Sequence, residues 1–290
     1  MSLPSVDTVV SFAGGAVSGS ATVVHVAEHH LGTVVLTDRT PCHPVDPRWP
    51  DQGPDRGELH FGGGSVQLID AVIGATDGVI LAVGEEVTAR RGDPGWAFVV
   101  AHLISGQERP PAEGEEVVFA VDAGYRLRLS AGHTGCHVAA LALNAALAGR
   151  WRKAVTTDGL GNPDFDQLAI VSSRIRPDGA VDMYRLGRTL RKKGFDAEGL
   201  VSALPEIQAV VDQQLARWVA AGPAVEVVSH GPLLTDLREW ACYLPEGTVR
   251  IPCGGTHLRS LTEVVAITGV LQADPSAGEL TMTTTVQRVE

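Results

Sequence analysis

The N-terminal part of the chain alternates short apolar runs with Gly- and Pro-rich turns. Six such runs occur, at residues 22–26, 32–36, 65–69, 78–83, 97–103 and 117–121. Strands of this length, joined by turns and a few longer loops, are typical of a small sheet that closes on itself. The pattern therefore predicts a small antiparallel β-barrel at the N-terminus, over residues 1–123.

The spacing of apolar residues becomes helical further along the chain. Small and apolar residues recur without proline over residues 130–148, with Ser130 placed to cap the helix and Gly149 to end it. A second helix is predicted over residues 205–221, because its apolar residues fall on one face and Gly222 follows.

Five strand-like runs lie between and after these helices, at residues 169–171, 224–229, 249–251, 264–271 and 280–286. Helices and strands that do not alternate regularly favour an α+β fold over a doubly wound sheet. We therefore expect the barrel to be followed by an α+β two-layer domain over residues 124–290.

Composition indicates a globular protein and bears on its location. The chain is 44% hydrophobic, and it contains no run of about 18 uncharged apolar residues, the length that a membrane span requires. The start of the sequence lacks the basic flank and apolar core of a secretory signal. These features predict a cytoplasmic protein that does not bind a membrane.

The distribution of charge separates one segment from the rest. The formal net charge is -11, which argues against a protein that coats nucleic acid non-specifically. Residues 148–193 nevertheless contain ten Arg or Lys against five Asp. A basic segment on an acidic protein fits a ligand with a few phosphates, such as one end of an RNA, although a solvated helix surface gives the same pattern.

Two short clusters of histidine and cysteine carry the candidate chemistry. His133 and His137 are four residues apart, so both imidazoles face one side of the predicted helix, and Cys253 and His257 form a second pair downstream. Imidazole nitrogen and thiolate sulfur are ligands that zinc prefers. The sequence therefore predicts one zinc site that contains all four side chains.

This ligand set leaves a structural and a catalytic role open. A structural site usually closes all four positions with protein ligands, whereas a hydrolytic site is rich in imidazole and leaves room for water. Three His and one Cys lie between these types. The first cluster contains no Glu, so the general base of the His-Glu-x-x-His metallopeptidases is missing, and peptidase chemistry is disfavoured.

Both clusters resemble the motifs of a known family. Residues 133–137 read His-Thr-Gly-Cys-His, and residues 253–257 read Cys-Gly-Gly-Thr-His. They resemble, in order and spacing, the His-Thr-Ala-x-His and Cys-x-Gly-Thr-His motifs of the editing domain of alanyl-tRNA synthetase and of its free-standing AlaX relatives. Segments 38–41, 52–57 and 243–247 are also similar to family sequences. The resemblance covers nearly the whole chain and is to the longer AlaX type, which has an N-terminal barrel.

The resemblance implies a zinc-dependent hydrolase that removes a wrong amino acid, serine or glycine, from alanine tRNA in trans. It implies that the four ligands hold Zn2+ with a zinc-bound water, and that the partner is the acceptor end of an aminoacylated tRNA. Thr134 and Thr256 then become candidate contacts to the substrate or the developing oxyanion. Simpler roles are open too, with Thr134 as a helix-start residue and the two glycines of the second motif as a tight turn.

Six further residues are candidate substrate contacts. They are small residues beside the ligands and basic residues that follow the predicted helix: Cys136, Gly254, Gly255, Arg150, Arg152 and Lys153. Three departures from the family bear on the substrate. Cys136 stands where Thr is common, residues 150–155 contain no equivalent of a Gln at the editing pocket, and residues 44–51 replace a triple-glycine loop.

Two other functions therefore stay open beside editing. One is hydrolysis of another small amino-acid ester or amide by a zinc enzyme, which the pocket differences would favour. The other is a non-catalytic, zinc-stabilised RNA-binding module, which a closed four-ligand site would favour.

Overall fold

The computed structural model describes residues 3–105 and 109–289, so residues 1, 2 and 290 at the ends of the two predicted domains lie outside the described residues. The fold is mixed α+β, as expected, and it contains two compact units. The first unit holds the described residues up to Arg126 together with Val227–Arg238 and Gly254–Thr256. The second holds Leu127–Glu226, Glu239–Cys253 and the residues from His257 onward.

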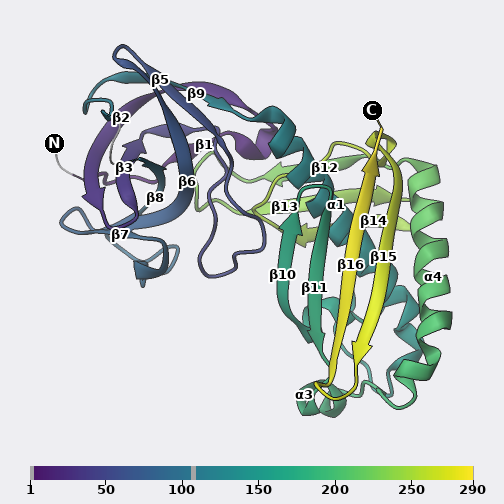
Figure 1. The fold of residues 1–290 in the computed structure, drawn as a ribbon. Coiled ribbons are helices and arrows are strands. Elements are labelled where there is room, and N and C mark those ends of the chain that lie inside the picture. The colour runs from purple at the N-terminus through teal and green to yellow at the C-terminus, as the bar shows by residue number, and fades with distance from the viewer. Residues whose placement is uncertain (1–2, 106–108, 290) are drawn as a thin grey trace. The chain divides into compact units, whose positions relative to one another are not determined.

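Six antiparallel strands of the first unit close into a ring (Figure 1). Their order is β5-β9-β2-β3-β8-β6, and pairing of β6 with β5 completes the ring. Their bounds are β2 Ser18–His29, β3 Gly32–Thr37, β5 Gly57–Phe61, β6 Gly64–Thr76, β8 Ala97–Ile104 and β9 Glu116–Val121. Apolar side chains from all six strands fill the interior, among them Val35, Leu59 and Phe119. This ring-like antiparallel sheet agrees with the closed sheet that the apolar runs predict.

Two details of the ring differ from the sequence-based expectation. Strand β5 was not predicted, because Leu59 is its one buried residue and the preceding stretch is rich in turn residues. The run at residues 78–83 is not a ring strand: only β7, Leu81–Val83, is extended, and it pairs with β6 outside the ring. Shorter elements complete the unit, namely β1 Val9–Val10, β4 Arg39–Thr40, η1 Phe12–Gly14 and η2 Gly84–Glu86.

The long helix α1, Ala123–Ala146, starts earlier than the apolar pattern predicts. Its cap is Asp122, whose Oδ1 accepts the Tyr125 amide at 2.9 Å, so the expected cap at Ser130 is wrong. Arg126 in the first turns is buried and pairs with the buried carboxylate of Asp55, with Nε 2.6 Å from Oδ1. The first turns were missed because their charged residues interrupt the apolar repeat.

A four-stranded antiparallel sheet forms the centre of the second unit, in the order β10-β11-β16-β15 (Figure 1). The strands are β10 Ile170–Arg176, β11 Gly179–Arg185, β15 Val264–Asp274 and β16 Glu279–Arg288. The chain also forms a three-stranded sheet of β12 Val225–Ser229, β13 Arg238–Leu244 and β14 Gly247–Pro252, of which residues 227–238 are assigned to the first unit. The remaining elements of the second unit are the short helices α2 Phe165–Ala169 and α3 Arg188–Lys192, and the 3-10 turns η3 Ala148–Arg150 and η4 Leu261–Glu263.

The second long helix, α4 Leu200–Ala221, runs beside the edge strand β15 (Figure 1). It starts one turn before the predicted Pro205, and Gly222 ends it in a left-handed conformation with φ 58°, as predicted. Gln208 of α4 donates to Gly269 O at 2.7 Å and accepts the Leu271 amide at 2.9 Å. The side-chain amide thus covers backbone groups that an edge strand leaves open.

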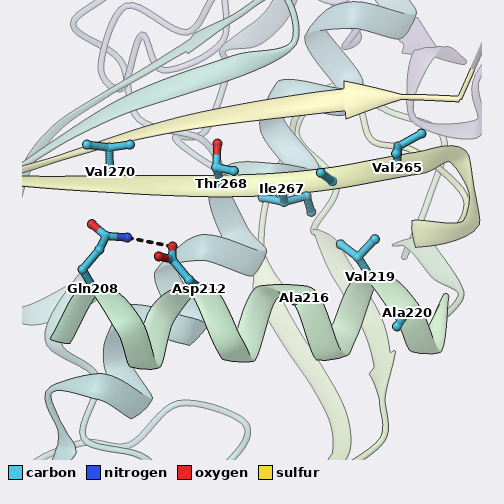
Figure 2. A pocket seen from close by; sticks show the side chains of 10 residues that line it. Gln208, Asp212, Ala216, Val219, Ala220, Val265, Ile267, Thr268 and Val270 are labelled. Carbon is cyan, nitrogen blue, oxygen red and sulfur yellow. Dashed lines mark hydrogen bonds between the residues drawn. The ribbon is translucent and has the colours of Figure 1, made fainter. Parts of the chain in front are cut away.

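A mostly apolar groove remains between α4 and β15 (Figure 2). Gln208 and Asp212, which are joined by a 2.8 Å hydrogen bond, and Thr268 are its polar side chains. None of the residues that line the groove is a His or Cys, so it is separate from the candidate chemistry.

Two glycines let α1 approach the four-stranded sheet closely. A methyl group on Gly132 would overlap the backbone of Arg176 and Gly179, and one on Gly135 would overlap the side chain of Val286. Gly135 stands where the family motif has Ala, and here it brings the motif against β16. The register of the histidine-bearing turn over the sheet therefore depends on these two glycines.

None of the helices in the described part of the chain is both long and apolar enough to cross a membrane.

Substitution of Gly132 by Ala should destabilise the protein, because the new methyl group meets rigid backbone rather than a movable side chain. We expect a loss of about 1–3 kcal/mol in the free energy of unfolding, measured by urea denaturation. Gly124→Ala is the matched control in the same helix, where the methyl group has room at 3.4 Å from Asp122 Oδ1. Equal stability of the two variants would contradict the close approach.

Candidate metal centre

Four potential ligands come together in the second unit. His133 and His137 project from successive turns of α1, and Cys253 and His257 follow β14. One donor atom from each of the four lies within 4.8 Å of the others. Cys253 Sγ is 3.4 Å from His133 Nε2 and 3.3 Å from His257 Nε2. The structure thus brings together the two clusters that the sequence places far apart.

The geometry and chemistry of these donors fit a metal ion. With Zn–N near 2.05 Å and Zn–S near 2.3 Å, a tetrahedral zinc separates its nitrogen and sulfur ligands by about 3.5 Å. The two sulfur–nitrogen distances lie within about 0.2 Å of that spacing. His133 is buried and the other three residues are half-buried, so the cluster is largely enclosed but not sealed from solvent. The four side chains could therefore hold a metal such as zinc.

The Thr134 side chain contacts His257, one of the four potential ligands. Its hydroxyl oxygen accepts the Leu258 amide at 3.1 Å and lies 3.2 Å from Nδ1 of His257. When Nε2 of an imidazole faces a metal, Nδ1 carries the ring proton and donates it to a nearby oxygen. Thr134 is fully buried, so its hydroxyl orients His257 from behind. The predicted contact of Thr134 with substrate stays a prediction.

Trp240 of β13 forms an apolar wall next to the ligands. Its buried indole ring is 5.0 Å from the ring of His137 and 6.1 Å from that of His257, measured between centroids. An apolar neighbour of this kind limits solvent access to a metal and restricts the movement of imidazole ligands. Sequence reasoning missed Trp240 because a single Trp in a strand gives no signal of such a role.

The second candidate threonine, Thr256, is held by Gln52 within the first unit. The Gln52 amide accepts the Thr256 backbone N–H and donates to the Thr256 hydroxyl, both at 3.0 Å. Thr256 precedes His257, so this pairing fixes the backbone that leads into a ligand. Gln52 lies in the segment 52–57 that resembles the family, but the sequence alone does not reveal its partner.

The two glycines of the second motif have different surroundings. Gly254 is exposed, and a methyl group there would meet no atom within 4 Å. Gly255 is buried. The loop therefore has open space beside Gly254, and contact of either glycine with substrate remains a prediction.

Cys136 points to the four-stranded sheet. Its sulfur lies 3.4 and 3.5 Å from the two carboxylate oxygens of Asp182 and 3.8 Å from the hydroxyl of Ser173. Burial raises the pKa of the Cys136 thiol well above its ordinary value, and the charge of Asp182 raises it further. The thiol therefore stays protonated and donates to Asp182. Among the described residues, the group of donors at the metal centre does not include it.

The three basic candidates lie beyond the end of α1. Ala146, the last residue of α1, is about 14 Å along the helix axis from His137, at 1.5 Å per residue. Arg150 donates to the carbonyl oxygens of Asp196 and Glu198, and Arg152 pairs with the Asp196 carboxylate at 2.7 Å. Lys153 is exposed and donates to a backbone carbonyl. These side chains therefore bond to the segment 192–198, and their contact with substrate stays a prediction.

Asp166 of α2, a half-buried residue, belongs to the polar group behind α1. The Tyr184 hydroxyl donates to its Oδ1 at 2.9 Å. Burial raises the pKa of Asp166 to about 7, and the neighbouring charge of Asp182 adds to the shift, whereas the Tyr184 hydrogen bond opposes it. Sequence reasoning gave this residue no role.

Substitution of Thr134 by Val should weaken metal binding without unfolding the protein. Loss of a partner that orients a histidine ligand typically lowers metal affinity about 10–100-fold. We expect that loss in Thr134→Val in a competition assay with a zinc chelator, and recovery in Thr134→Ser, which keeps the hydroxyl. Equal zinc affinity of Thr134→Val and wild type, at equal helical content, would show that His257 needs no such support.

The raised pKa of Asp166 predicts a pH-dependent stability. The folded-state pKa of about 7 lies above the ordinary 3.8, so the protonated carboxyl contributes stability that is complete below about pH 4 and lost as the pH rises to about 7. Asp166→Asn cannot ionise. As the pH rises from 4 to 7, the free energy of unfolding of Asp166→Asn should therefore increase relative to that of wild type, by up to roughly 4 kcal/mol. A difference that does not vary with pH would rule out the shift.

Comparison with known proteins relates the chain to an aminoacyl-tRNA synthetase. No protein-family model matches the chain. The chain is 28% identical over 244 residues to the alanine–tRNA ligase of Pyrobaculum neutrophilum. The match covers 80% of this chain but only 22% of that ligase. This distant similarity agrees with the relation to alanyl-tRNA synthetase that the two motifs indicate.

Proposed function

We propose that this protein is a zinc-dependent hydrolase that removes serine or glycine from mischarged alanine tRNA in trans, as AlaX-type proteins do. The observation that carries the proposal is the convergence of His133, His137, Cys253 and His257, with donor atoms within 4.8 Å of one another. The distant similarity to an alanine–tRNA ligase supports the same substrate class. A cluster of three imidazoles and one thiol also differs from the thiolate-rich sets of most structural zinc sites.

Hydrolysis of an aminoacyl ester requires the protein mainly to bind the substrate and to orient a water molecule. An aminoacyl ester is already activated, so an oriented water is sufficient and the missing Glu of the first motif is no obstacle. When bound, zinc supplies Lewis-acid stabilisation of charge that develops on the ester oxygen. Thr134 fixes the ring of His257, and the indole of Trp240 restricts water beside His137.

Recognition of the tRNA would use the basic segment after α1. Arg152 and Lys153 are exposed, and Arg150, Arg152 and Lys153 are tied to the segment 192–198 by the hydrogen bonds described above. A protein with net charge -11 that concentrates basic groups in one segment binds phosphates there rather than over its whole surface. The acceptor end of one charged tRNA is a ligand of that kind.

A non-catalytic RNA-binding module is the second candidate. Four protein donors are enough to close a tetrahedral site, which is the usual arrangement in structural zinc centres. In that case the metal would stabilise the loop after β14, and the protein would act only by binding RNA through its basic segment. A hydrolase of another small amino-acid ester or amide is the third candidate, and the burial of Cys136 against Asp182 distinguishes this chain from the usual Thr of the family motif.

A deacylation assay separates these functions. Metal-replete protein is expected to hydrolyse seryl- or glycyl-tRNA charged on alanine tRNA faster than the correct alanyl-tRNA. Cys253→Ala should lower that rate at least about 100-fold, since loss of a ligand disturbs both the metal and its position. Circular dichroism shows whether the variant keeps its fold, and Cys42→Ala, which removes a buried cysteine of the first unit, is the matched control.

Three outcomes would change the assignment. No hydrolysis of any charged tRNA by metal-replete protein, beside a working deacylase, would leave the RNA-binding module. Hydrolysis of free amino-acid esters at a rate equal to that of charged tRNA would favour the small-ester hydrolase. Full activity of folded Cys253→Ala would show that the reaction does not need the thiolate, since three imidazoles and a water can also bind zinc.

A further inference from the structure

A second group of potential metal ligands lies in the first unit. His29 ends β2, His30 is in the turn that follows, and Glu86 ends the 3-10 turn η2. Their ligand atoms lie within 4.8 Å of one another. His29 Nε2 is 3.3 Å from both carboxylate oxygens of Glu86, and His30 Nδ1 is 3.8 Å from Oε1. The centroids of the two imidazole rings are 4.1 Å apart.

These distances are close to those of ligands on one ion. Zinc with Zn–N and Zn–O bonds near 2.1 Å separates its tetrahedral ligands by about 3.4 Å. The His29–Glu86 distances agree with this spacing, and the His30–Glu86 distance is about 0.4 Å too long. His30 and Glu86 have side chains that are 66% and 47% exposed, so both can rotate to close the gap. His29, with a side chain that is 14% exposed, is the anchored ligand.

The local charge and hydrogen bonding suit a cation. The Val83 amide donates to Glu86 Oε2 at 3.1 Å, and this hydrogen bond holds the carboxylate beside the two imidazoles. Each ligand segment also has an acidic neighbour in sequence, Glu28 beside His29 and Glu85 beside Glu86. These charges attract a cation to the turn.

We propose that His29, His30 and Glu86 bind a second divalent transition-metal ion, of which Zn2+ is the representative, with water in the remaining position. Two imidazoles and one carboxylate are a ligand set that zinc and similar borderline ions accept. The Leu31 amide now donates to His29 Nδ1 at 3.3 Å, and binding of the ion at Nε2 moves the ring proton to Nδ1 and gives up this long hydrogen bond. The ion would join the β2–β3 turn to η2. This proposal does not rest on the proposed function.

Cobalt distinguishes the two sites because only the centre on α1 contains a thiolate. Metal-free full-length protein is titrated with Co2+, and equilibrium dialysis gives the number of ions bound while thiolate-to-cobalt charge-transfer absorption reports on Cys253. We expect two ions per chain, of which only one produces that absorption. The ion bound by three protein ligands should be the weaker and should saturate later.

Two variants assign the second ion. His29→Gln and Glu86→Gln should each bind one Co2+ with the thiolate absorption unchanged. His60→Gln is the matched control and should still bind two, because His60 faces Glu58 at 3.5 Å on the same unit but belongs to no group of three ligands among the described residues. Binding of one ion by wild type, with thiolate absorption, would overturn the proposal, as would two ions in both variants. A single ion without thiolate absorption, lost in His29→Gln, would support this site and contradict the centre on α1.

Discussion

The meeting of four donor side chains within 4.8 Å is the constraint on which the other features of the second unit depend. Two donors lie on α1 and two follow β14, so the helix must keep a fixed position relative to that loop. Gly132 and Gly135 provide for this by letting α1 lie directly against the four-stranded sheet. Thr134, between the two histidines in sequence, connects the helix to the loop through Leu258 and His257.

Polar groups on the two sides of α1 have different roles. On the sheet side, the protonated thiol of Cys136 donates to Asp182, and the Tyr184 hydroxyl donates to Asp166, so these carboxylates have hydrogen-bond donors inside the fold. On the ligand side, imidazoles and one thiol gather beside the indole of Trp240. One helix thereby separates groups that stabilise the fold from groups that could bind a metal, a division that follows from its 3.6-residue period.

The grouping of the four candidate ligands could be predicted because each pair spans five residues, so local spacing brings its two donors together. The similarity of the motifs to a family joined the two pairs. Five of the six ring strands followed from apolar runs, and the end of α4 followed from Gly222. The pairing of Gln52 with Thr256 could not be predicted, because it joins residues that are distant in sequence through one side-chain amide. The sequence also could not show that the Cys136 thiol faces the four-stranded sheet, because this depends on which face of α1 packs against the sheet. The predicted start of α1 was too late. The first turn is capped by Asp122 and held by the ion pair of Arg126 with Asp55, so it lacks the apolar residues that mark a buried helix in a sequence.

X-ray absorption at the zinc edge tests most directly whether the four donors bind the metal, because it identifies the atoms that coordinate zinc independently of any enzymatic activity. Protein that holds one tightly bound zinc ion per chain should show one sulfur scatterer near 2.3 Å and nitrogen scatterers near 2.0–2.1 Å with the multiple-scattering pattern of imidazole. Cys253→Ala should lose the sulfur. A coordination shell of oxygen and nitrogen alone in wild-type protein would contradict the assignment of the metal centre to His133, His137, Cys253 and His257.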